Sequence, residues 1–199
     1  MFHYYHELEI QKVLNSPQGP VSGSTKSTLI GRNFNQTNVC NRKVKYGTIE
    51  VTPVLHNDTC MEVVSPRVSD PGAVVLFPSG NAQNYAKDWI LHYRDIENTY
   101  TYYQDMFVHD LHPQSGPTTG NTRLEVTGIG FKQFKYDNGT LRDDMPLYVK
   151  FVDQTTGAQI GDIGTINDID NDAFIWHTPK AKEGTKAILE LSLNKQNWQ

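Results

Sequence analysis

The chain has 199 residues, enough for one large β domain or two small ones. It carries 18 Lys and Arg residues against 22 Asp and Glu residues, which gives a formal net charge of -4 with both signs scattered along the sequence. Because affinity for nucleic acid depends mostly on clustered basic side chains, this balance argues against a nucleic-acid partner. No apolar run reaches the roughly 18 residues that a membrane-spanning helix needs.

The N-terminal segment reads MFHYYHELEI, without the basic start and apolar run of a signal peptide. Its first five residues, MFHYY, align with TYTYY at residues 99–103, where the last strand of a first unit is expected. We therefore interpret residues 1–6 as a last-strand remnant of a preceding repeat. The alternative is a donor strand that completes another copy of the chain, head to tail.

Tyrosines gather near both predicted unit boundaries, at Tyr4, Tyr5, Tyr102 and Tyr103. One interpretation is packing within the strands. The other is an interdomain or intermolecular interface, since tyrosine is enriched at protein interfaces.

The first unit, residues 7–104, has the pattern of short strands. The hydrophobic period is near 2, because Val44 alternates with Tyr46 and Val74 with Leu76. Turn clusters such as SPQGP and SDPG separate these runs, and no segment keeps a helical period over three turns. This unit is therefore expected to be a small β-sandwich.

The two cysteines of the chain, Cys40 and Cys60, both lie in this unit. They are close enough in sequence to be bridged between neighbouring strands, and an even pair suits an oxidising compartment. Such a disulfide would stabilise the fold by roughly 3 kcal/mol; the alternative is two buried free thiols. Three N-x-[ST] sequons begin at Asn35, Asn57 and Asn138 and predict N-glycosylation of a secreted protein.

The second unit, residues 105–199, repeats the first. GPVSGSTKSTLIGRNF and GPTTGNTRLEVTGIGF match at six positions that are all 97 residues apart, and this offset also pairs Ile10 with Phe107. Further along, PSGNAQNY and LSLNKQNW match at four positions 113 residues apart. The larger offset predicts about 16 inserted residues between Phe131 and Pro179.

Alternating apolar residues predict the strands of this second unit. They form three runs: Leu124 and Val126; Leu147, Val149 and Phe151; and Ala187, Leu189 and Leu191. Gly128 and Gly130 are expected to permit a bulge or a close backbone approach before Phe131 returns to the core. No counterpart of residues 99–103 follows the final hairpin. The predicted fold class is all-β, with two tandem immunoglobulin-like β-sandwiches.

These motifs resemble the IPT/TIG family of immunoglobulin-like domains. The family's start resembles SPQGPVSGSTKSTLIGRNF and HPQSGPTTGNTRLEVTGIGF, and its middle strand resembles CNRKVKYG and PLYVKFVD. The family's segment that ends at a proline resembles NDTCMEVVSP and NDAFIWHTP. Its later strand and Asn-rich hairpin resemble VVLFPSGNAQNY and ILELSLNKQNW. The second unit contains no cysteine, so its stability is expected to depend on core burial alone.

The resemblance implies a scaffold or interaction module. The family occurs in stalks of extracellular receptors of the plexin and scatter-factor receptor kind, in the dimerising half of Rel-type transcription factors, and as accessory domains of carbohydrate-active enzymes. The sequons, the cysteine pair and the acidic balance favour the extracellular setting. The sequence therefore predicts a non-catalytic adhesion or stalk segment with protein partners and no cofactor, with a Rel-like or a carbohydrate-enzyme accessory domain as alternatives.

One acidic stretch has the spacing of a metal loop. Asp168, Asp170 and Asp172 match positions 1, 3 and 5 of a calcium-binding loop. Ala173 stands where the loop needs Gly and Pro179 where it needs Glu, so an EF-hand is excluded. A surface metal site is the weak alternative to a solvated acidic loop. No catalytic motif is present.

Overall fold

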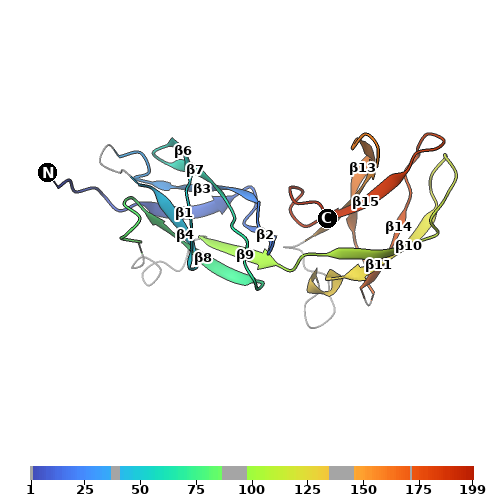
Figure 1. The fold of residues 1–199 in the computed structure, drawn as a ribbon, viewed down its shortest axis with the longest axis horizontal. Coiled ribbons are helices and arrows are strands. Elements are labelled where there is room, and N and C mark those ends of the chain that lie inside the picture. The colour runs from blue at the N-terminus through green and yellow to red at the C-terminus, as the bar shows by residue number, and fades with distance from the viewer. Residues whose placement is uncertain (1, 37–40, 87–97, 135–145, 171) are drawn as a thin grey trace. The chain divides into compact units, whose positions relative to one another are not determined.

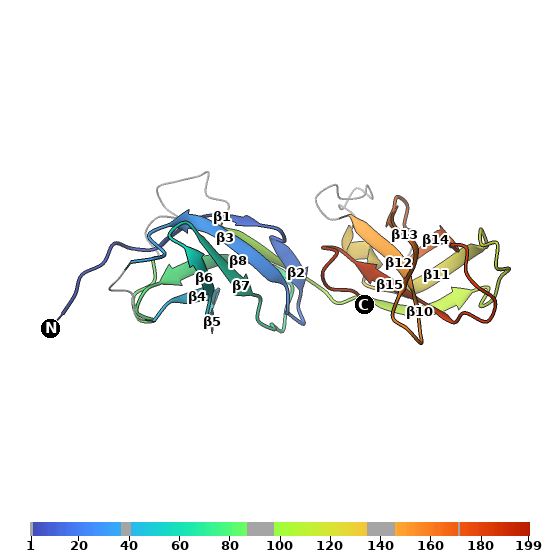
Figure 2. The same ribbon diagram turned by 90° about the horizontal axis from the view of Figure 1, so that it is seen from above.

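The computed structural model describes residues 2–36, 41–86, 98–134, 146–170 and 172–199, and it divides into two compact units (Figures 1 and 2). The units span Met1–Tyr103 and Gln104–Gln199. The described residues of both units form β-strands, and those of the second also form a short 3-10 turn, η2 (Phe131–Phe134). The predicted all-β class with two immunoglobulin-like sandwiches is confirmed.

The described residues of the first unit form nine strands in two sheets. They are β1 (Glu9–Leu14), β2 (Gln18–Pro20), β3 (Lys26–Arg32), β4 (Lys43–Tyr46), β5 (Ile49–Val51), β6 (Val54–Asn57), β7 (Cys60–Val64), β8 (Gly72–Ser79) and β9 (Thr99–Tyr103). One sheet has the order β1-β3-β7-β6 and the other β2-β9-β8-β4-β5. The core lies between them and includes Leu29, Val44, Met61 and Leu76, as the alternation of apolar residues requires.

The second unit has two three-stranded sheets among its described residues. Its strands are β10 (Phe107–His112), β11 (Arg123–Ile129), β12 (Leu147–Asp153), β13 (Gln159–Ile166), β14 (Ala173–His177) and β15 (Ala187–Ser192). The sheet orders are β10-β11-β14 and β13-β12-β15. The predicted inward residues of the three alternating runs are buried except Ala187, which is exposed because it pairs with Asp153 at the ends of β15 and β12.

Equivalent hydrogen bonds recur in the two units. The amide of Gly23 donates to the Pro20 carbonyl at 2.9 Å, and the amide of Gly120 donates to the Pro117 carbonyl at 3.0 Å. Both glycines have positive φ, +80° and +72°, where a side chain is disfavoured. The predicted turns at these glycines are therefore present.

The Asn-rich hairpins are also alike. The Asn81 side-chain oxygen accepts the amides of Gln83 and Asn84 at 3.0 and 2.9 Å. The Asn194 oxygen accepts the amides of the two corresponding residues, Gln196 and Asn197, both at 2.9 Å. Asn side chains stabilise such turns by replacing backbone acceptors.

Strand register corrects one predicted pair and refines the insertion. Ile10 lies opposite Gly31, whereas Val108 lies opposite Gly128, so Ile10 corresponds to Val108 and not to Phe107. The prediction was wrong by one residue, because the chain between strand and glycine is one residue shorter in the second unit.

The register also locates the predicted insertion. Val44 lies opposite Pro78, and Val149 lies opposite Leu191. β12 therefore follows β4 by 105 residues, midway between the offsets of 97 and 113. The extra residues are thus divided equally before and after β12.

Candidate interaction surfaces

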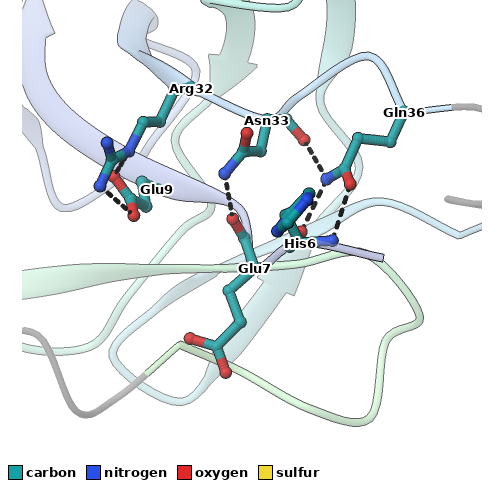
Figure 3. A network of polar contacts seen from close by, with 6 residues as sticks. All are labelled: His6, Glu7, Glu9, Arg32, Asn33 and Gln36. Atoms are coloured by element: carbon teal, nitrogen blue, oxygen red, sulfur yellow. Dashed lines mark hydrogen bonds and ion pairs between the residues drawn. The ribbon is translucent and has the colours of Figure 1, made fainter. Parts of the chain in front are cut away.

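A polar network anchors the N-terminal segment to the first unit (Figure 3). The Gln36 side chain accepts the His6 amide at 2.7 Å and donates to the His6 carbonyl at 2.6 Å. The Asn33 side chain donates to the Glu7 carbonyl at 2.9 Å. Because these bonds hold the backbone through residue 6, the segment that precedes it leaves the unit from a fixed point.

The same clamp occurs in the second unit. The Gln133 side chain accepts the Gln104 amide and donates to the Gln104 carbonyl, both at 2.9 Å. Sequence reasoning did not single out these glutamines. A signal was present, since Gln36 and Gln133 occupy the same position of the repeat.

The aromatic residues before the clamp are exposed. Phe2 is 80% and Tyr4 87% exposed, and their rings contact each other edge to face at 5.1 Å. Tyr5 is half-buried, and its ring lies over Gly80. Phe2 to Tyr5 line a hollow of about 200 Å³ with the Pro78–Asn81 segment.

The tyrosines of β9 have the opposite environment. Tyr102 and Tyr103 are both buried, and Tyr102 donates from its hydroxyl to the Pro66 carbonyl at 3.0 Å. The Tyr102 ring packs edge to face against Tyr100 and Tyr46, with centroids 4.9 and 6.3 Å apart. For Tyr102 the structure therefore shows strand packing, and the predicted interface role stays a prediction for the exposed Tyr4.

β9 occupies a defined position in the first unit. It pairs with β8 on one side, where Tyr100 lies opposite Val74, and with β2 on the other. In the second unit, the described residues contain no such strand beside β15, although the Gln199 backbone exchanges two hydrogen bonds with Leu191 of that strand. There Ile188, which corresponds to Val75 of β8, is 43% exposed, and the Ser115–Pro117 segment, which corresponds to β2, is exposed.

Three of the predicted modification sites, Asn35, Asn57 and Cys60, lie among the described residues of the first unit. Asn35 and Asn57 are exposed, and the Asn57 side-chain oxygen accepts the Thr59 amide at 2.8 Å. Cys60 is partly buried in β7. Cys40 and the third sequon asparagine, Asn138, lie outside the described residues, so the disulfide and that glycosylation site stay predictions.

The three aspartates of the predicted acidic loop do not form a metal cluster. Asp168 and Asp170 are exposed, and Asp172 has a positive φ of 63° at the turn into β14. Among the described residues, no three His, Cys, Asp or Glu side chains lie close enough to hold a metal ion. The same part of the chain has no helix long and apolar enough to cross a membrane.

The sheet order defines the first unit as an immunoglobulin-like β-sandwich. The model of the IPT/TIG domain family matches residues 10–87, which lie within the first unit. The second unit, which lies outside the matched range, repeats the turns, the glutamine clamp and the Asn-rich hairpin of the first.

Comparison with solved structures finds two models of the plexin A4 full extracellular region. One, with domains 1 to 10, is 13% identical, has a TM-score of 0.49 and is matched over 97% of this chain and 15% of the plexin chain. The other, with domains 1 to 8, is 15% identical, has a TM-score of 0.48 and is matched over 96% of this chain and 17% of the plexin chain. This chain therefore spans less than a fifth of either structure. No curated protein matches it.

Proposed function

We propose that the chain is a non-catalytic segment of an extracellular or cell-surface stalk that makes protein–protein contacts. The observation that carries the proposal is the tandem repetition of one packed module, in which the turn glycines, the glutamine clamps and the Asn-rich hairpins all serve the fold. IPT/TIG domains are typical interaction modules. The exposed sequon asparagines Asn35 and Asn57 and the cysteine pair support an extracellular location.

The extracellular location is tested by secretion of the chain from mammalian cells behind a heterologous signal sequence. Glycosylation is expected at Asn35, Asn57 and Asn138, so treatment with a peptide N-glycosidase should lower the mass by one step per occupied site. Asn57→Gln should remove one step, since this side chain is exposed. As a control, Asn98→Gln lies outside any sequon and should leave the mass ladder unchanged. Secreted protein whose mass the glycosidase does not change would contradict the proposal.

We further propose that the stalk segment binds a second copy of itself, head to tail. In the alignment of MFHYY with TYTYY, Phe2 matches Tyr100 and Tyr4 matches Tyr102. Tyr100 and Tyr102 are buried, whereas Phe2 and Tyr4 are the two most exposed large hydrophobic side chains among the described residues. The N-terminal segment of one copy would take the place of β9 in the second unit of another, beside β15.

A further inference from the structure

The outer edge of β14 has no partner strand among the described residues. β14 pairs with β11 on one side, and the Gly128 amide donates to the Asp172 carbonyl at 3.0 Å where that ladder begins. Backbone groups of an antiparallel strand alternate between its two neighbours. The amide and carbonyl groups of Ile175 and His177 therefore face away from β11, toward the open edge.

In the first unit, a strand covers the corresponding edge. Glu62 of β7 holds the position that Ile175 holds in β14, and it pairs with Val54 of β6. In the second unit, Asp170 and Ala173 exchange backbone hydrogen bonds of 2.8 and 2.7 Å just before this point. Among the described residues, no strand equivalent to β6 lies between β13 and β14.

A groove of about 430 Å³ runs along this open edge. Ile175, which is 39% exposed, and the half-buried Trp176 supply its apolar surface. Three carboxylates, those of Glu125, Asp168 and Asp170, lie around it, and His177 is at one end. At neutral pH the groove therefore combines an open backbone edge, apolar surface and negative charge.

We propose that this edge binds an extended, basic segment of a partner protein, which adds to the sheet as a fourth strand next to β14. Its backbone would bond to Ile175 and His177, and an apolar side chain would cover Ile175. Lys or Arg side chains would lie beside Asp168 and Asp170, since complementary charge fixes register and suppresses wrong partners. This inference rests on the proposed function as a protein-interaction module, and it specifies one partner of that module, an extended basic segment.

The experiment uses the whole chain, isotope-labelled for NMR, and blocked peptides that alternate Lys with Val or Glu with Val. The Lys–Val peptide should shift the amide signals of Ile175 and His177, and its binding should weaken as salt is raised. The Glu–Val peptide should produce no shift at the same concentration. Equal binding of both peptides, or no binding of the basic one at millimolar concentration, would overturn the proposal.

Two variants locate the binding. Ile175→Pro removes an outward amide without removing a bond to β11, and proline is tolerated at strand edges. Asp168→Asn with Asp170→Asn removes two charges from the groove, and Asp162→Asn with Glu183→Gln removes two exposed charges elsewhere on the same unit.

Each groove variant should weaken binding of the Lys–Val peptide at least tenfold, whereas the control pair should stay within twofold. Unchanged affinity in the Asp168 and Asp170 variant would reject the groove even if the proline variant failed to fold. Because glycosylation and self-association do not involve the β14 edge, failure here would leave the stalk proposal standing.

Discussion

At the scale of single residues, Gly128 is required by close packing rather than by its backbone angle. A Cβ at this position would collide with the Phe107 carbonyl oxygen and with the Phe131 ring. Gly31 has the same relation to Glu9 and Phe34 in the first unit. The sequence predicted a close backbone approach near Gly128, and the structure identifies the atoms.

Gly128→Ala is expected to destabilise the second unit by roughly 1–3 kcal/mol, because backbone and a buried ring must both move. Thermal unfolding followed by circular dichroism should show its transition lowered by about 4–8 °C per kcal/mol. Arg123→Ala, at an exposed position of the same strand, should change stability by no more than about 0.5 kcal/mol. A Gly128→Ala protein with the parental melting temperature would show that the crowding is relieved without cost.

At the scale of elements, β9 brings ionisable rings into the core of the first unit. Burial raises the pKa of Tyr46 far above its ordinary value, and the neighbouring Tyr100 and Tyr102 raise it further. Burial also raises the pKa of Tyr100 and of Tyr102. The folded unit therefore keeps these hydroxyl protons at a pH where the unfolded chain has lost them.

The contribution of these tyrosines to the free energy of unfolding of the first unit should accordingly be constant below about pH 10 and fall as the pH rises further. Chemical denaturation between pH 8 and 11.5, with tyrosinate absorbance as a second signal, measures this. Tyr46→Phe removes one such proton and should make the slope shallower by up to about 1.4 kcal/mol per pH unit.

The second unit provides an internal comparison, because its buried Phe131–Phe174 ring pair, with centroids 5.4 Å apart, carries no ionisable group. A first unit whose free energy of unfolding stays constant from pH 8 to 11.5 would contradict the raised pKa values of these buried tyrosines.

Local patterns were sufficient to predict most strands, because a period of two follows from which face is buried. Leu124 and Val126 are inward for this reason. Pairing between distant segments was harder to predict. The one-residue shift between Ile10 and Val108 depends on turn length, and the open edge of β14 depends on whether the preceding residues form a strand. The alternation of apolar residues predicts neither the length of the turn nor whether the residues before β14 form a strand.

At the scale of the whole molecule, the proposed strand donation depends on the repetition of one unit. Residues 2–5 have the aromatic spacing of β9, and among the described residues no strand pairs with β15 beside the exposed Ile188, where β9 would lie. Insertion of a strand beside Ile188 would cover apolar surface and satisfy an open edge, which soluble proteins otherwise protect. Repeated between copies, the proposed contact would be heterologous and would generate an open filament.

Sedimentation velocity over a wide concentration range tests this assembly. The chain should form larger species as concentration rises, because strand donation would bury Phe2 and Tyr4 in another copy. Phe2→Ser with Tyr4→Ser should remove assembly, since each buried aromatic ring contributes roughly 1.5–3 kcal/mol. His3→Ser is the matched control, because His3 aligns with Thr101, between the inward positions of β9. A chain that stays monomeric at all concentrations, or a double variant that assembles like the parent, would reject strand donation.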